Sequence, residues 1–379
     1  MVVPDFNAMA QPALRRLRAY DPGHDIVALR RRFCDGALLE LGSNENSCGA
    51  SPAAIAAFHG CAPQLHRYPD PLGGDLKQAI ANKLGLRHGQ VLLGNGSHEL
   101  LMLLAQVFAG PGAHVLASQF GFAVYAIAAH AAGAPFIAAT ALGPNDAMPR
   151  GHDLAAIARA VDDDTRLIYL ANPNNPTGSW FSTDALQTFL SGLPAHVIVV
   201  VDEAYMEYVT DPALVSAVSL LDESAQLVVT RTFSKAYGLA GLRVGYACAQ
   251  PGLLQVLDRI RESFNVNSAG LAACLAAVED DEHVQWVRVS NAAERQWLAD
   301  QLDRRRVAVD PSQTNFLLVD FVRDAAPLEA RLLERGVVLR PMAGYGLPTC
   351  LRITVGTRGE NQRLLDALDA INKKDAEQP

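Results

Sequence analysis

Residues 232–243 read TFSKAYGLAGLR and follow the apolar run 227–229, which predicts a buried strand. Lys235 therefore lies just beyond the end of that strand, between hydroxyl side chains and Arg243. A lysine amine can form a Schiff base with an aldehyde. The neighbouring hydroxyls and the guanidinium can hold a phosphate. Pyridoxal 5′-phosphate carries both groups, so the stretch indicates a site for that cofactor, although most lysines are only solvated surface charges.

Two upstream segments carry further groups for the same cofactor. Residues 171–178 read ANPNNPTG, a composition typical of a turn, and residues 197–205 read VIVVVDEAY. Asp202 ends the apolar run of the second segment, where open α/β sheets bind ligands. Facing the ring nitrogen, its carboxylate would keep that nitrogen protonated and the ring a good electron sink. A helix cap or a nucleotidase acid would also explain Asp202, but the GxxxxGK[ST] loop of the nucleotidase is absent from the sequence.

These three segments, in this order, resemble the fold-type I pyridoxal-phosphate aminotransferases, and most closely the histidinol-phosphate aminotransferase branch. The resemblance covers nearly the whole chain, from Tyr20 and residues 44–46 (NEN) to residues 351–357 (LRITVGT). It implies an α/β fold: a large domain on a mostly parallel sheet of the seven-stranded type and a smaller α+β domain. The chain departs from the family at Ser47, where proline is usual.

The resemblance also implies which residues hold the cofactor. Lys235 is the catalytic residue, and Asn175 and Tyr205 donate hydrogen bonds to the phenolic oxygen beside the aldehyde. Taken alone, the Asn-Pro segment is simply a turn. The full set of implied cofactor contacts is Ser97, His98, Phe122, Asn175, Asp202, Tyr205, Thr232, Ser234, Lys235, Arg243 and, from a neighbouring subunit, Tyr68.

A glycine-rich turn, residues 94–99 (GNGSHE), precedes the apolar helical segment 100–108. Glycines before a helix let backbone N–H groups and the positive helix end approach a phosphate. Glu99 stands where a Rossmann fingerprint has its third glycine, so that match is weak. In the family this turn holds the cofactor phosphate, with Ser97 and His98 as donors. The family more often has an acidic or amide residue at the position of His98.

The resemblance implies cofactor contacts for two aromatic residues, each of which could instead have a purely structural role. Phe122 corresponds to the ring that stacks on the cofactor; the alternative is core packing, with Phe120 as the other candidate for stacking. Tyr68 corresponds to the tyrosine that reaches the cofactor phosphate of the neighbouring subunit, whereas Tyr-Pro-Asp alone reads as a turn. With Tyr68 in this role, the active protein is a homodimer with shared active sites.

Arginines near the C-terminus indicate the substrate site. Arg352 lies in an apolar strand, where an unpaired guanidinium is very costly, so it is either paired internally or functional. Its planar fork suits an α-carboxylate. In the histidinol-phosphate enzymes the residues matching Arg340 and Tyr20 contact the distal phosphate of the substrate, although both could instead be surface residues. The resemblance adds Asn46 as a further substrate-binding candidate.

The implied activity is amino-group transfer by a ping-pong mechanism, with Lys235 moving the Cα proton as base and acid. L-Histidinol phosphate is the first candidate donor, which would place the chain in histidine biosynthesis, and 2-oxoglutarate is the acceptor. An aromatic amino-acid aminotransferase and a threonine-phosphate decarboxylase stay open, because they share the cofactor half of the site. A pyridoxal-phosphate-binding regulator would need a DNA-binding module, and no basic helix-turn-helix segment is evident.

Composition favours a soluble globular protein. The chain has 379 residues, 50% hydrophobic and 19% charged, which suits two or three domains with a large core. A net charge of −8 argues against nucleic acid or an anionic membrane as the main partner. The six cysteines have neither disulfide-framework nor zinc-site spacing, and the Ala-rich stretch 126–142, read as a helix end and a strand, is too short to span a membrane. We therefore expect a cytoplasmic protein without a metal.

Short apolar runs alternate with helical patterns from about residue 51. They lack polar alternation, as expected of strands covered on both faces of a parallel sheet. The predicted strands are residues 115–117, 166–170, 196–201, 227–229, 315–319 and 351–355, and residues 253–263 predict a helix. The expected domains are an arm with part of the small domain (1–50), a large cofactor-binding domain (51–263) and a C-terminal small domain (264–379).

Overall fold

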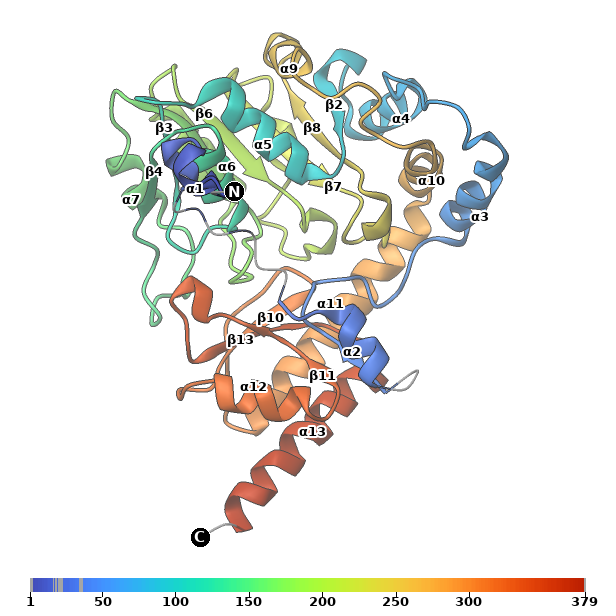
Figure 1. The fold of residues 1–379 in the computed structure, drawn as a ribbon, viewed down its shortest axis with the longest axis vertical. Helices are drawn as coiled ribbons and strands as arrows, with labels where there is room; N and C mark the ends of the chain where they lie inside the picture. The colour runs from blue at the N-terminus through green and yellow to red at the C-terminus, as the bar shows by residue number, and fades with distance from the viewer. Residues whose placement is uncertain (1–2, 16, 18, 20–22, 34–36, 378–379) are drawn as a thin grey trace.

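A seven-stranded sheet forms the centre of the larger part of the protein (Figure 1). The computed structural model describes residues 3–377 except 16, 18, 20–22 and 34–36, and from residue 374 onward only the backbone. The strand order is β2-β8-β7-β6-β5-β3-β4. All neighbouring pairs are parallel except those of β8, which is antiparallel to β2 and β7. The strands are β2 (Val91–Gly94), β3 (His114–Ser118), β4 (Phe136–Ala139), β5 (Thr165–Ala171), β6 (Ile198–Asp202), β7 (Leu227–Thr232) and β8 (Gly245–Ala249).

The central strand β6 explains the missing polar alternation. Val199 and Val201 are buried in the core on one face of the sheet, and Val200 is buried in the core on the other. One face is covered by α3 (Pro52–Gly60), α4 (Gly74–Leu84), α7 (Leu154–Arg159), α8 (Thr183–Ser191) and α10 (Ser268–Glu279). The other face is covered by α5 (Ser97–Phe108), α6 (Val124–Ala131) and α9 (Pro251–Asp258). The α/β class with a mostly parallel sheet is thus confirmed.

A second, antiparallel sheet organises the C-terminal part. Its order is β12-β13-β10-β9, and a separate parallel pair joins β1 to β11. These strands are β1 (Leu39–Glu40), β9 (Ala308–Val309), β10 (Phe316–Asp320), β11 (Val337–Val338), β12 (Arg340–Pro341) and β13 (Cys350–Thr354). The helices α11 (Asp281–Arg304), α12 (Ala326–Leu333) and α13 (Arg358–Glu377) contribute to the same core. Two short helices, α1 (Phe6–Met9) and α2 (Ile26–Arg32), precede β1.

Most predicted elements are present, with local differences. The predicted strands overlap β3, β5, β6, β7, β10 and β13, with ends that differ by up to three residues, and the stretch 126–142 holds the end of α6 and then β4. The helix predicted at 253–263 begins at Pro251 and ends earlier, at Asp258, before a turn. Strands β2 and β8 of the large sheet and the short strands β1, β9, β11 and β12 are not predicted from the sequence.

The two cores do not divide the chain into simple consecutive blocks. Leu39 and Leu41, near the N-terminus, belong to the core of the C-terminal part. Helix α10 lies beyond residue 264 but packs on α3 and α4, and its Ala273 and Cys274 belong to a core of the seven-stranded sheet. The domain limits 1–50, 51–263 and 264–379 stay a proposal.

The carboxyl ends of the parallel strands define one edge of the large sheet, where a ligand site is expected. Asp202 ends β6 and Thr232 ends β7 at this edge. The start of α5 lies so close to β8 that a side chain at Gly245 would collide with the backbone at Gly96 and Ser97. The close approach brings the first turn of α5 to the ends of β6 and β7.

Candidate active site

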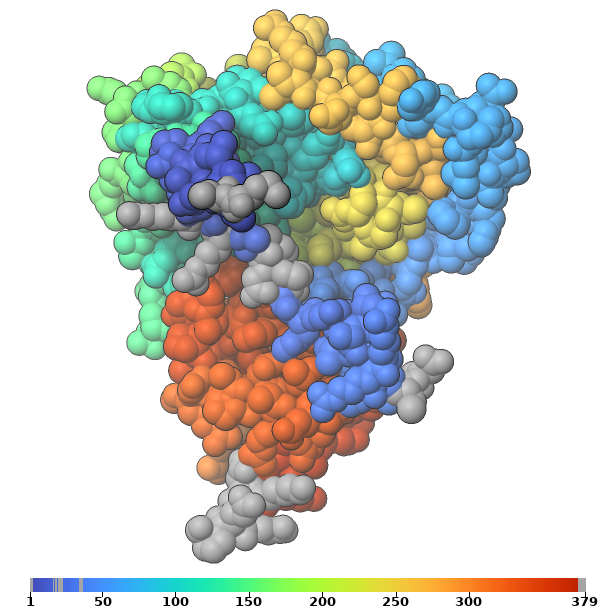
Figure 2. All heavy atoms as spheres, viewed as in Figure 1, coloured from blue at the N-terminus to red at the C-terminus, as the bar shows by residue number. Residues whose placement is uncertain are grey.

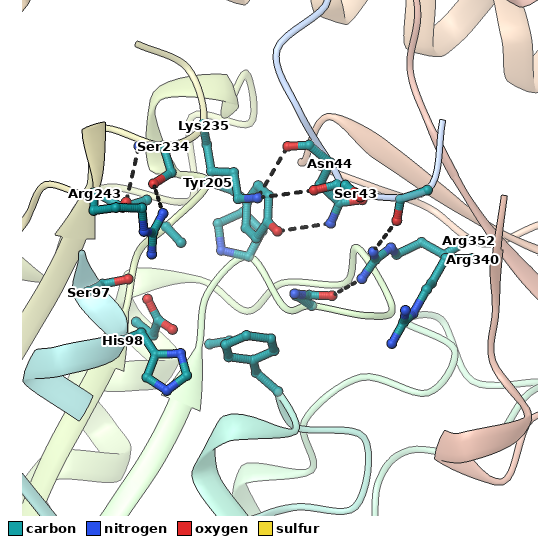
Figure 3. A pocket seen from close by; sticks show the side chains of 18 residues that line it. Ser43, Asn44, Ser97, His98, Tyr205, Ser234, Lys235, Arg243, Arg340 and Arg352 are labelled. Atoms are coloured by element: carbon teal, nitrogen blue, oxygen red, sulfur yellow. Dashed lines mark hydrogen bonds between the residues drawn. The ribbon is translucent and has the colours of Figure 1, made fainter. Parts of the chain in front are cut away.

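A cavity of about 350 Å³ lies at this edge, between the large sheet and the C-terminal sheet (Figure 3). It brings together most of the residues predicted from the sequence. The predicted residues that line it are Ser97, His98, Phe122, Asn175, Asp202, Tyr205, Thr232, Ser234, Lys235, Arg243, Arg340 and Arg352. Gly42, Ser43 and Asn44 line the same cavity and come from the segment after β1.

The amine of Lys235 lies at the cavity, beside Asn44 and Tyr205 (Figure 3). Its Nζ donates to the backbone oxygens of Ser43 at 3.4 Å and Asn44 at 3.2 Å, and it lies 5.8 Å from the ring centre of Tyr205. Burial, followed by the positive charge of Arg352, lowers the pKa of Lys235 to about 8. Roughly a tenth of the amine is therefore unprotonated at pH 7, far more than for an ordinary lysine, and this is the form that attacks a carbonyl carbon.

The carboxylate of Asp202 is buried at the end of β6, with 5% of the residue exposed. It accepts hydrogen bonds from the Tyr125 hydroxyl at 3.1 Å and the Thr230 hydroxyl at 3.2 Å. Burial raises the pKa of Asp202 to about 6, and the two hydrogen bonds oppose that rise. Above pH 6 the side chain is predominantly an anion, suited to face a protonated ring nitrogen.

An anion cradle is formed around the first turn of α5. Arg243, with a left-handed backbone at φ 56°, donates from Nη1 to Ser234 Oγ at 3.2 Å. Gly96 has φ 80°, a backbone conformation that glycine adopts without strain, and a Cβ there would also press on Nη2 of Arg243 at 2.8 Å. The Ser97 hydroxyl and the free N–H groups at the helix start face the same space. Thr232 Oγ1 accepts from the backbone N–H of Ser234 at 3.1 Å.

His98 lines the same end of the cavity, in the first turn of α5. Burial, followed by the charge of Arg243, lowers its pKa, so the imidazole is neutral at pH 7. A neutral imidazole can donate one hydrogen bond without adding charge. Cofactor contact through this side chain stays a prediction.

The aromatic and amide groups also line the cavity. Asn44 Nδ2 donates to Tyr205 Oη at 3.0 Å, and Arg352 Nη1 donates to Asn175 Oδ1 at 2.7 Å. Phe122 precedes α6, and its ring lies edge-on to that of Tyr125 with ring centres 5.9 Å apart. Phe120, the other candidate for stacking, is buried and does not line the cavity.

Arg340 and Arg352 occupy paired positions on β12 and β13, and both line the cavity (Figure 3). Arg352 Nη2 donates to the backbone oxygen of Gly42 at 2.8 Å, and its guanidinium lies 5.3 Å from the ring centre of Phe316. The C-terminal sheet therefore supplies two positive groups on one side of the space. Tyr20, predicted to act with Arg340, lies outside the described residues.

Two predicted residues lie away from this cavity. Tyr68 is 82% exposed and stacks on Phe264 with ring centres 4.6 Å apart. Asn46 Nδ2 donates to the backbone oxygens of Ala236 at 2.9 Å and Gly49 at 3.2 Å. The role of Tyr68 in a partner subunit and the role of Asn46 toward substrate stay predictions.

Sequence reasoning missed several residues at the site, among them Asn44 and Tyr125. Asn44 is buried with φ 55°, and its backbone N–H donates to Thr354 Oγ1 at 2.9 Å. Asparagine tolerates a left-handed backbone, so an Asn-rich loop without periodicity was the available signal. For Tyr125, which contacts Asp202, a single sequence carries no signal beyond an aromatic residue in a helix.

The donor set fits the phosphate, ring nitrogen and aldehyde of the predicted cofactor: the cradle at α5, the Asp202 carboxylate and the Lys235 amine all border one cavity. Within the described part of the chain, no group of three or more His, Cys, Asp or Glu side chains is arranged to hold a metal ion. Among the helices that the structure describes, none is both long and apolar enough to cross a membrane. The described cysteines, Cys48, Cys61, Cys248, Cys274 and Cys350, are free thiols.

Comparisons with known proteins match this chain to aminotransferases. A family model, aminotransferase class I and II, matches residues 37–368. The histidinol-phosphate aminotransferase 2 of Pseudomonas aeruginosa is 44% identical over 97% of this chain and 98% of its own length. That of Pseudomonas fluorescens is 45% identical with the same coverage. A crystal structure of histidinol-phosphate aminotransferase from Sinorhizobium meliloti with pyridoxal 5′-phosphate is 31% identical, with a TM-score of 0.86 over 96% of this chain and 98% of that one.

Proposed function

Because the chain belongs to the class I and II aminotransferases, we propose that it transfers the amino group of L-histidinol phosphate to 2-oxoglutarate by a ping-pong mechanism. It is an aminotransferase that depends on pyridoxal 5′-phosphate. The donor, the acceptor and the kinetic order belong to the proposal. The paired arginines Arg340 and Arg352 are the observation that carries it.

The residues of the cavity would hold the cofactor at both ends. Ser97, Ser234, Arg243 and the start of α5 would bind the phosphate, and Asp202 would face the ring nitrogen. Bound there, the cofactor supplies an aldehyde that takes the amino group and a ring that accepts electrons.

Lys235 supplies the proton transfer. With a pKa of about 8, its Nζ is basic enough to take the Cα proton of the substrate and acidic enough, once protonated, to return it. The backbone oxygens of Ser43 and Asn44 accept from this amine and hold it at the centre of the site. One side chain therefore provides both the base and the acid.

The two arginines match the charges of the proposed substrates. L-Histidinol phosphate has a phosphate and no α-carboxylate, whereas glutamate and 2-oxoglutarate each have two carboxylates. Arg352, beside Asn175 and near Lys235, would bind the α-carboxylate of the acceptor. Arg340, one strand further out on β12, would bind the distal phosphate of the donor. The names of the relatives support the same donor.

A half-reaction screen tests this proposal. The holoenzyme is mixed with one amine at a time, and conversion of the cofactor to its amine form is followed by absorbance. We expect L-histidinol phosphate to react at least about tenfold faster than L-histidinol, since a charge-assisted contact to the phosphate is lost. Faster reaction of L-phenylalanine would favour an aromatic aminotransferase, and carbon dioxide released from threonine phosphate would favour a decarboxylase.

We also propose that the protein is a cytoplasmic homodimer. Apolar side chains are exposed on and after α3, which projects from the edge of the larger part (Figures 1 and 2). They are Ile55, Phe58, Leu65, Tyr68, Leu72 and, from another segment, Phe264. Apolar surface of this kind supports contact with a second copy. The free thiols of the described cysteines support a reducing compartment.

Mixed dimers test whether sites are shared. Lys235→Ala and Tyr68→Phe variants are each assayed alone, then unfolded together and refolded. If Tyr68 serves the partner's site, a mixed dimer regains one complete site, and activity exceeds the sum of the two separate variants. Activity equal to that sum, or a monomer in sedimentation, contradicts the proposal.

A further inference from the structure

Both oxygens of the Asp202 carboxylate are held from outside the cavity. Thr230, on the neighbouring strand β7, donates to Oδ1 at 3.2 Å. Tyr125, on α6, donates to Oδ2 at 3.1 Å. These contacts come from two different elements, so they fix the plane of the carboxylate as well as its position.

Tyr125 itself cannot easily move. It is fully buried, and its ring stacks on Tyr169 of β5 with centres 4.7 Å apart and planes 5° apart. The Tyr169 hydroxyl in turn donates to the backbone oxygen of Leu101 at 2.6 Å. The two rings form a rigid column between α5, β5 and α6, with the Tyr125 hydroxyl at its end against Asp202.

The same short segment also presents Phe122 to the cavity. Phe122 and Tyr125 are three residues apart, and their rings meet edge-on. The segment that begins α6 thus presents one aromatic ring to the cavity and one hydroxyl to the acid that borders it. A change in the placement of α6 would alter both contacts together.

We propose that Tyr125 is a positioning residue that orients the Asp202 carboxylate and keeps it ionised for the ring nitrogen of the cofactor. The inference rests on the proposed placement of that nitrogen at Asp202. Tyr125 touches neither substrate nor the reacting carbon in this scheme, and it acts only through Asp202.

The electrostatics of the site agree with this role. Burial raises the pKa of Asp202 to about 6, with a smaller upward contribution from Glu203, while the hydrogen bonds from Tyr125, Thr230 and the backbone N–H of Ala204 lower it. The negative charge of Asp202 in turn raises the pKa of Lys235, against the larger lowering by burial. Burial, followed by the Asp202 charge, raises the pKa of Tyr125 well above its usual value, so its hydroxyl remains a donor. Loss of that donor therefore raises the pKa of Asp202 further.

The test measures cofactor binding rather than turnover. Apo-protein is titrated with pyridoxal 5′-phosphate and with its 1-deaza analogue, in which carbon replaces the ring nitrogen, over a range of pH. The variants are Tyr125→Phe and the matched control Tyr169→Phe, which removes the next hydroxyl in the column. We expect Tyr125→Phe to weaken binding of the natural cofactor about tenfold at pH 7 and to leave the analogue unchanged. In Tyr169→Phe the ratio of the two affinities stays as in the unmodified protein.

The pH dependence gives a second readout. Binding that needs the Asp202 anion falls as pH drops through its pKa, so the midpoint in the unmodified protein is expected near pH 6. In Tyr125→Phe the midpoint moves to higher pH, by about one unit. An unchanged midpoint, or equal losses for both ligands, overturns the inference, because equal losses are what a purely structural role produces.

Two further variants keep the outcome decisive. Asp202→Asn tests the premise: if it does not reduce the preference for the natural cofactor over the analogue, the placement of the ring nitrogen is wrong. If it does and Tyr125→Phe does not, only the role of Tyr125 is wrong. Where Tyr125→Phe fails to fold, 3-fluorotyrosine at position 125, a stronger donor, should move the midpoint to lower pH; no movement overturns the inference.

Discussion

The Lys235 amine shows how burial and neighbouring charges together set the pKa of one residue. Burial lowers its pKa most, and Arg352 contributes the largest charge effect. Both act in the same direction, toward the neutral amine that the chemistry needs. Arg352, which would bind a substrate carboxylate, therefore also prepares the base.

This coupling gives a pH prediction for the apo-protein. The rate at which Lys235 reacts with the cofactor should rise through about pH 8, as the amine loses its proton. Arg352→Gln removes a neighbouring positive charge, raises the pKa of Lys235 and moves the rate profile to higher pH by up to about one unit. The measurement is the association rate by absorbance at a series of pH values.

Arg340→Gln is the matched control for that experiment. Arg340 lines the same cavity but is not among the charges that shift the pKa of Lys235 most. Its removal should leave the midpoint in place. An equal shift in both variants would mean that the total positive charge of the cavity, rather than Arg352 in particular, sets the pKa of the Lys235 amine.

At the scale of secondary structure, the antiparallel pair β12 and β13 separates two anion-binding tasks. Arg340 and Arg352 are directly opposite in the register, so one lies a strand spacing further from the centre of the site. The arrangement predicts that each arginine serves a different end of the substrates.

We expect Arg340→Gln to lower kcat/KM for L-histidinol phosphate by about 10–100-fold, the loss of a charge-assisted contact. The half-reaction with glutamate, which has no distal phosphate, should change little. Steady-state kinetics with the phosphorylated donor and single-turnover rates with glutamate measure the two effects. Comparable losses in both would argue against a phosphate-specific position.

Elements also show what a single sequence can and cannot predict. The position of Lys235 followed from an apolar run and the residues after it, because a buried parallel strand has a definite carboxyl end. The sequence did not indicate whether Asn44 or Asn46 lines the site, because a loop has no periodicity from which the direction of its side chains could be predicted. The structure buries Asn44 against Tyr205 and turns Asn46 to backbone oxygens. The contact of Tyr125 with Asp202 joins residues 77 apart in sequence and depends on how α6 packs on the sheet.

At the scale of the whole molecule, the cavity depends on how its two parts are held together. Arg150, from the loop before α7, donates to both oxygens of Asp310 at 2.8 and 3.0 Å and to Asp320 at 2.6 Å. The three side chains are mostly buried. This cluster ties the larger part to β10 and to the residue after β9 in the C-terminal sheet.

Arg150→Met should lower the free energy of unfolding by about 1–3 kcal/mol, because two partly buried carboxylates lose their cation. The control is Arg159→Met, whose partner Asp153 is 4.0 Å away and whose side chain is 72% exposed. That exposed pair should contribute less than about 1 kcal/mol. Denaturant unfolding measures both variants, and equal losses would contradict a special role for the cluster.

The pairing of β1 with β11 also constrains how the protein is made. Residues 39–41 emerge from the ribosome early but find their partner strand only after most of the chain has been synthesised. The contacts from the C-terminal part to the segment that follows, from Asn44 N–H to Thr354 Oγ1 and from Asn315 Nδ2 to the Asn44 backbone oxygen, can form only after the seven-stranded sheet has been synthesised. A nascent chain released before β13 would carry Lys235 and Asp202 but no closed pocket, so competence to retain the vitamin B6 cofactor should appear only near the end of translation.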